Sequence, residues 1–98
     1  MLDEENKGLL IQWFLVSEPT DEVIDLLKNQ DCSIQACVAS LTRSTKVIES
    51  LAESRYWQVR QAIAYNYFLP DEVGNKLYDD EHIQVRFAII NSRILEGI

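Results

Sequence analysis

Residues 58–63 read Gln-Val-Arg-Gln-Ala-Ile and residues 84–89 read Gln-Val-Arg-Phe-Ala-Ile, so the same segment returns after 26 residues. The match extends upstream, where Val47 recurs as Val73 at the same separation. A repeat of this length is typical of proteins in which each unit packs against the next and cannot bury its apolar face alone. The sequence therefore predicts stacked units.

Each unit contains two apolar segments with the spacing of an α-helix. In the first segment, Val47, Ile48 and Leu51 lie at i, i+1 and i+4, which is one helical face. Thr20 and Ser44 precede segments of this type and can accept hydrogen bonds from free backbone N–H groups at a helix start. The second segment is longer and carries the repeated Val-Arg-x-Ala sequence. We expect a short helix followed by a longer one in each unit.

A weaker copy lies upstream of these two units. Residues 21–27 resemble residues 45–51, and residues 33–39 take the place of the later Gln-Val-Arg segments, with Cys37 where Arg60 stands. Residues 8–17 form a further apolar segment ahead of this copy. Terminal repeats often differ because one side faces solvent, so we interpret residues 8–17 as a helix that closes the N-terminal end.

The segment from Val59 to Asn66, the following Pro70, and the segment Val85 to Ala88 together resemble the leucine-rich repeat variant, a bacterial relative of HEAT and armadillo repeats. The best-known member of that family carries a cysteine-rich iron–sulfur segment, and this sequence has no such cluster. Tyr67 replaces the proline that usually follows the asparagine. The resemblance therefore implies a helical repeat fold and no cofactor.

We predict an all-α fold, a short α-solenoid of HEAT-like two-helix repeats with about seven helices in a single domain of residues 1–98. The parts are a capping helix (1–19), a degenerate repeat (20–44) and two good repeats (45–69 and 70–98).

The composition limits the partners of this protein. The net charge is −7 and the pI is near 4.5, whereas binding to nucleic acid draws on clustered Lys and Arg. No uncharged run approaches the roughly 20 residues that span a bilayer. We therefore expect another protein with a basic surface as partner, and neither nucleic acid nor membrane.

The N-terminal residues and the cysteines indicate the compartment. Residues 1–7 are acidic, whereas a secretory signal begins with basic residues and continues into a longer apolar core. Cys32 and Cys37 are the only cysteines, and their spacing suits neither a disulfide framework nor a zinc site. We expect a cytoplasmic protein with reduced thiols.

Arg60 and Arg86 occupy the same position in two copies of the repeat, which favours a structural role over ligand binding. In HEAT-like units such an arginine binds an acid of the preceding turn, which predicts Asp80 for Arg86 and Glu53 for Arg60. Asn66 and Asn91 are expected at helix ends, where asparagine tolerates the left-handed conformation. His82 is expected in an exposed loop.

Two groups of residues are candidates for partner contacts. Trp57 and Tyr65 belong to a dense aromatic set, and such residues are enriched at binding hot spots, although part of the set must form the core. Acidic residues lie at the starts of the first helices and in the turns after them, where solvated helix ends are the simpler explanation. They are Asp21, Glu22, Asp25, Asp31, Asp71, Glu72, Asp79, Asp80 and Glu81.

These features favour a small acidic inhibitor, such as an immunity protein that neutralises a basic nuclease-type toxin by occluding its active site. Alternatives are an adaptor or self-associating scaffold, and a phage-encoded inhibitor of a host defence protein. A homodimer could form through the C-terminal helix, whose Ile94, Leu95 and Ile98 are apolar. No P-loop, dinucleotide motif or nucleophile elbow occurs, so we do not expect an enzyme, a metal or a cofactor.

Overall fold

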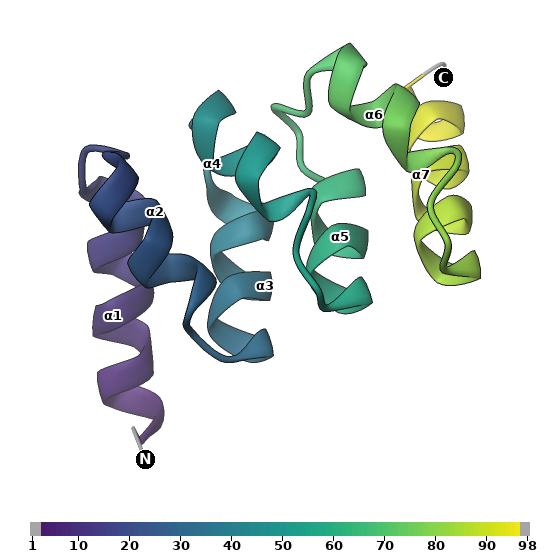
Figure 1. The fold of residues 1–98 in the computed structure, drawn as a ribbon. Helices are drawn as coiled ribbons and strands as arrows, with labels where there is room; N and C mark the ends of the chain where they lie inside the picture. Colours follow the sequence, from purple (N-terminus) through teal and green to yellow (C-terminus); the bar gives the residue numbers. More distant parts are fainter. Residues whose placement is uncertain (1–2, 97–98) are drawn as a thin grey trace.

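The computed structural model describes residues 3–96, which fold into seven α-helices and contain no strand (Figure 1). The prediction of an all-α fold is confirmed. The helices are α1 (Glu4–Val16), α2 (Asp21–Lys28), α3 (Cys32–Leu41), α4 (Thr45–Leu51), α5 (Trp57–Ala64), α6 (Asp71–Leu77) and α7 (Ile83–Glu96).

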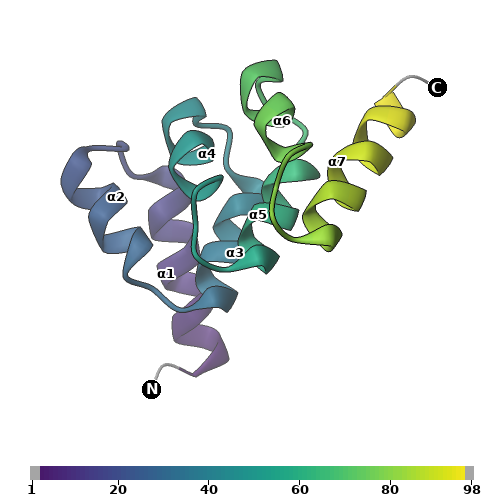
Figure 2. The ribbon, with the colours of Figure 1, turned by 45° about the vertical axis from the view of Figure 1, so that its right-hand side comes forward.

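The helices form two layers (Figures 1 and 2). The inner layer consists of α1, α3, α5 and α7, each packed against the next, and the outer layer consists of α2, α4 and α6. Each expected two-helix unit thus contains one outer and one inner helix, while α1 and α7 lie at opposite ends of the inner layer. None of the helices between residues 3 and 96 has the length and apolar character that a membrane crossing requires.

Four helices begin at a side-chain cap. The side chains of Asp3, Thr20, Asp31 and Ser44 each accept a hydrogen bond from the backbone N–H three residues later, at 2.8 to 3.3 Å. These bonds satisfy N–H groups that the helix itself leaves unpaired. The caps predicted at Thr20 and Ser44 are confirmed.

The core follows the repeat. Val59 and Ile63 of α5, like their counterparts in α7, are 0% exposed. In α3 the equivalent buried residues are Ile34 and Val38, 25 residues before those of α5. This register places Gln35, which is buried, at the position of Arg60. The expectation that Cys37 occupies that position is therefore wrong, and Cys37 is exposed.

The expectation that asparagines end the inner helices in a left-handed conformation is also wrong. No residue of the described segment has a positive φ angle, and α5 ends with Tyr65 still near helical geometry at φ −94°. Asn66 instead caps a neighbouring helix, because its Nδ2 donates to the carbonyl oxygens of Ala39 (2.7 Å) and Thr42 (2.9 Å). Asn91 lies inside α7.

Candidate protein-binding surfaces

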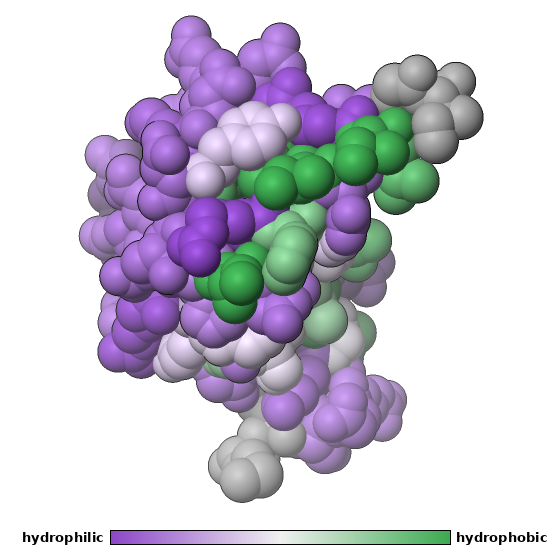
Figure 3. All heavy atoms as spheres, turned by 90° about the vertical axis from the view of Figure 1, so that its right-hand side faces the viewer, coloured by the Kyte–Doolittle hydropathy of each residue, from purple (hydrophilic) through white to green (hydrophobic). Residues whose placement is uncertain are grey.

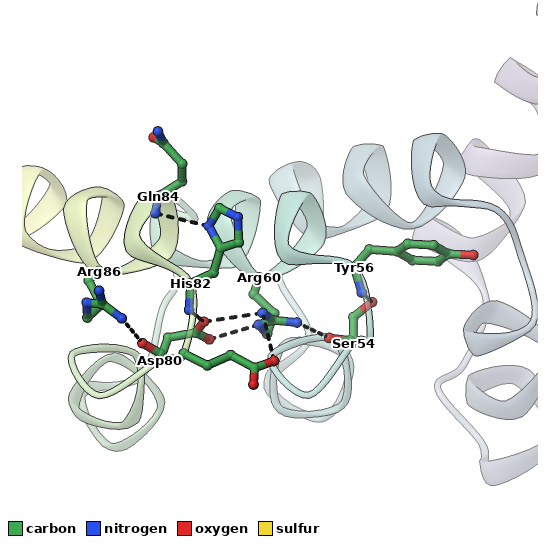
Figure 4. Close-up of polar contacts among 8 residues, drawn as sticks. Ser54, Tyr56, Arg60, Asp80, His82, Gln84 and Arg86 are labelled. Carbon is green, nitrogen blue, oxygen red and sulfur yellow. Dashed lines mark hydrogen bonds and ion pairs between the residues drawn. The ribbon is translucent and has the colours of Figure 1, made fainter.

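The turns before α5 and α7 are each tied to the inner helix of the preceding unit. Arg60 of α5 binds the Asp80 carboxylate with both Nε (2.8 Å) and Nη2 (3.2 Å), and its Nη1 donates to the Ser54 carbonyl at 2.6 Å (Figure 4). The Arg60 and Asp80 side chains are only 10% and 8% exposed. A buried bidentate pair of this kind fixes geometry strongly.

This pairing corrects the predicted partners of the two arginines. The Asp80 carboxylate binds the side chain of Arg60, which lies 20 residues upstream, and not the guanidinium of Arg86. Glu53, the predicted partner of Arg60, does not pair with it. Arg86 binds the backbone of the same turn, since its Nη1 donates to the Asp80 carbonyl at 2.6 Å (Figure 4). Arg60 therefore joins the turn before its own helix, α5, to the turn before α7 in the next unit.

Gln35 makes the same connection in the first unit with neutral groups. Its Nε2 donates to the carbonyl oxygens of Lys28 and Gln30, and its Oε1 accepts from the Ser54 hydroxyl at 2.8 Å. We call the Gln35–Ser54 and Arg60–Asp80 links the turn ladder. Arg86 begins a third link, but no carboxylate within residues 3–96 pairs with its guanidinium.

Asp80 was predicted as a partner contact, but its carboxylate is buried within the turn ladder and also accepts a hydrogen bond from the His82 N–H at 2.9 Å. It is not available to a partner. The neighbouring Asp79 and Glu81 are exposed, and the Glu81 carboxylate lies 3.9 Å from Arg60 Nη2. The acidic turn therefore divides into one structural and two accessible carboxylates.

The other predicted acids lie on the surface of the outer layer or the turns after it. Asp21, Glu22 and Asp25 are exposed on α2, and Asp71 and Glu72 at the start of α6. Two of them have basic neighbours within the molecule. Lys46 Nζ lies 3.0 Å from Asp21, and Arg93 Nη1 lies 3.3 Å from Asp71. Such exposed pairs contribute little to stability because water screens them.

Charge is divided between the two layers. The outer helices with the turns that follow them, residues 21–31, 45–56 and 71–82, hold eleven acidic and four basic side chains, a net charge of −7. The inner helices α1, α3, α5 and α7 hold three acidic and four basic side chains, a net charge of +1. The residues around α4 are neutral, so the negative charge gathers around α2 and around α6.

A groove of about 450 Å³ lies on the outer layer between α4 and α6. Of the predicted acids, Glu72 and Asp80 line it, and Glu49 and Glu53 line it as well. The sequence did not single out the last two. Their i, i+4 spacing is a usable signal, although any solvated helix face shows the same pattern. The basic residues at the groove are Lys28, Lys46 and Lys76.

The two aromatic candidates lie in different surroundings. Trp57 is half-buried against the core and stacks on His82, with ring centroids 4.3 Å apart. His82 lies in the turn before α7, as expected, and its Nδ1 accepts from the Gln84 N–H, but it is half-buried, so the expectation that it is exposed is wrong. Tyr65 is 49% exposed at the end of α5. It belongs to the inner layer and is not brought together with the outer-layer acids.

One predicted acid has a perturbed pKa. Asp31 accepts hydrogen bonds from the Ile34 N–H (3.0 Å) and the Ser33 hydroxyl (2.8 Å), and these hold the pKa of its carboxyl below the usual value. Burial, with a smaller effect of Asp31, raises the pKa of the Cys32 thiol. Cys32 and Cys37 are both free thiols.

No protein-family model, curated protein or solved structure matches the chain. Within residues 3–96, no group of three His, Cys, Asp or Glu side chains is arranged to hold a metal ion. The surface carries three candidate features: the acidic outer layer, its groove, and the exposed apolar residues of α1 and α7.

Proposed function

We propose that this chain is a small HEAT-like α-solenoid that binds a basic protein through its outer layer. The division of charge carries the proposal, because the outer helices and their turns hold a net charge of −7 and the inner helices α1, α3, α5 and α7 a net charge of +1. Such a dipolar surface orients a basic partner toward one face and speeds its association. The repeated turn ladder supports the solenoid interpretation.

The form of this function that fits best is inhibition of an enzyme that acts on nucleic acid, as an immunity protein neutralises a nuclease-type toxin. The active site of such an enzyme is basic because it must bind phosphates. Exposed carboxylates such as Glu49, Glu72 and Asp79 can take the place of those phosphates and occlude the site. A cytoplasmic location agrees with the two free thiols.

A scaffold or adaptor is the second candidate. A phage-encoded inhibitor of a host defence protein is a variant of the first candidate, because it would use the same acidic surface as an immunity protein. The scaffold is favoured by the apolar residues of α7, of which Ile94 and Leu95 are 58% and 65% exposed. Ile98, predicted to contribute to the same surface, lies outside the described residues.

The inhibitor proposal is tested by co-expressing the chain with basic nucleases encoded beside its gene and titrating the purified pair by calorimetry. The test variant is Glu49→Gln with Glu72→Gln in the outer layer. The matched control is Gln58→Lys with Gln84→Lys in the inner layer, which changes the net charge by the same amount at exposed positions. We expect the outer variant to weaken binding by about tenfold or more and the control by less than about threefold.

Nuclease activity in the same titration separates inhibition from mere binding. The inhibitor proposal requires activity to fall in proportion to the complex formed, and binding to weaken between about 50 and 300 mM salt. Equal effects of the two charge variants would contradict the outer-layer surface. A complex that leaves the nuclease fully active would contradict inhibition and favour the adaptor.

A further inference from the structure

Helix α7 presents an uncovered apolar face at one end of the molecule. Ile83, Phe87, Ile90 and Ile94 follow the spacing i, i+4, i+7 and i+11, so they lie on one face, and each is between 43% and 58% exposed. The view onto this end shows apolar side chains gathered in one patch (Figure 3). The opposite face of α7 is buried in the core.

Helix α1 presents a matching face at the other end of the inner layer (Figure 1). Leu9, Trp13 and Val16 follow the same i, i+4 and i+7 spacing and are between 44% and 75% exposed. Phe14, on the opposite side of the helix, is buried in the core. The molecule therefore ends in two apolar stripes, one on its first inner helix and one on its last.

Within the molecule, two of the four positions equivalent to the α7 stripe are covered. Trp57 lies 26 residues before Ile83 and stacks on His82 of the next unit. Ala64 lies 26 residues before Ile90 and is 0% exposed. Ile83 and Ile90 of the α7 stripe thus occupy positions that are covered in α5, whereas Phe68, equivalent to Ile94, is exposed.

The polar groups at the two ends are complementary in charge. In the turn ladder, Arg60 in the first turn of one inner helix binds Asp80 just before the start of the next. Arg86 occupies the position of Arg60 in the last inner helix, and no carboxylate within residues 3–96 pairs with its guanidinium. Helix α1 begins with the exposed acids Asp3, Glu4 and Glu5.

We propose that copies of this chain stack end to end, with α7 of one copy packed against α1 of the next. The apolar stripes meet, and Arg86 pairs with the acidic start of α1, as Arg60 pairs with Asp80 inside the molecule. All inner helices run in the same direction (Figure 2), so the start of α1 in the added copy comes beside the start of α7.

A back-to-back pair of α7 helices fits the structure less well. It would place two Arg86 side chains in the same interface, and the acid nearest to Arg86, the buried Asp80 before α7, is already bound by Arg60. End-to-end stacking leaves one α1 face and one α7 face free at the ends of every open assembly, so it continues into a filament unless it closes into a ring. It does not use the acidic outer layer and is independent of the proposed function.

Analytical ultracentrifugation of the full chain tests this mode with two blocked variants. Leu9→Asp blocks the α1 face and Ile90→Asp blocks the α7 face, both at exposed positions. We expect wild type to form species beyond a dimer between about 10 µM and 1 mM, and each variant alone to be monomeric. An equimolar mixture of the two should form a heterodimer and nothing larger, because each copy retains one working face.

Three results would overturn the proposal. These are a wild type that stays monomeric at about 1 mM, a Leu9→Asp variant that still dimerises through α7, and a mixture of the two blocked variants that does not associate. Circular dichroism and urea unfolding establish that both variants fold. In the wild-type background, Arg86→Glu should weaken association by at least about tenfold, and the equally charged change Arg55→Glu, at an exposed position between α4 and α5, should not.

Discussion

Replacing Asp80 by alanine should destabilise the protein more than the loss of any other carboxylate described above. The substitution removes both bonds from Arg60, at 2.8 and 3.2 Å, and leaves a guanidinium that is 10% exposed without its counter-charge. It also removes the acceptor for the His82 N–H. Removing one partner of a buried ion pair costs about 3 to 5 kcal/mol. This is a large fraction of the free energy of unfolding of a native protein, which is about 5 to 15 kcal/mol.

Urea unfolding followed by circular dichroism measures this loss at neutral pH. Asp71→Ala is the matched control, because Asp71 also pairs with an arginine but its side chain is 89% exposed, and we expect it to cost less than about 1 kcal/mol. The Arg60→Met, Asp80→Ala double variant should cost clearly less than the two single variants combined. Equal losses for Asp80→Ala and Asp71→Ala, or additive losses in the double variant, would refute a structural role for the buried pair.

Three further substitutions test other contacts by the same unfolding assay. Asn66→Ala should cost about 1 to 3 kcal/mol, since it leaves carbonyl groups at the end of α3 unpaired, whereas an unchanged midpoint would show that water replaces the amide. Trp57→Ala should cost about 2 kcal/mol or more through lost packing on the core and on His82, and Trp57→Phe should restore most of it. The pKa of Asp31 in the folded state is lowered. The stability that its carboxylate contributes is therefore fully present above the ordinary pKa of an aspartate and is lost as the pH falls through the pKa of the folded state. Asp31→Asn keeps a capping acceptor but does not titrate, so its stability should fall less than that of wild type on acidification below about pH 4.

The helices could be predicted from this sequence because two local signals agree. The 26-residue separation of the Gln-Val-Arg segments locates the inner helices α5 and α7, and capping residues such as Thr20 and Ser44 locate the starts of α2 and α4. The register of the first unit was missed by two residues. A buried glutamine there makes the contacts of an arginine, and the two side chains share no sequence likeness.

The contacts between units could not be predicted, because a single sequence does not specify which side chains of different units come together in space. Glu53 and Asp80 stand seven and six residues before the two arginines, so both looked like partners within their own units. The pairing is made across units because Arg60 extends toward the next turn. The role of Asn66 was missed for the same reason, since the helix that it caps belongs to the preceding unit.

The distribution of polar links has a consequence for how the molecule opens. Asn66 joins α5 to α3, and the turn ladder joins the three later units, but no hydrogen bond or ion pair in the part of the chain that the structure describes connects α1 to α3. Apolar contacts such as those of Phe14 hold α1 in place, with a weak attraction between the charges of Lys7 and Asp31. Amide hydrogens of α1 should therefore exchange with solvent through a local opening that leaves the other helices folded. The slowest exchange should occur in α3 and α5.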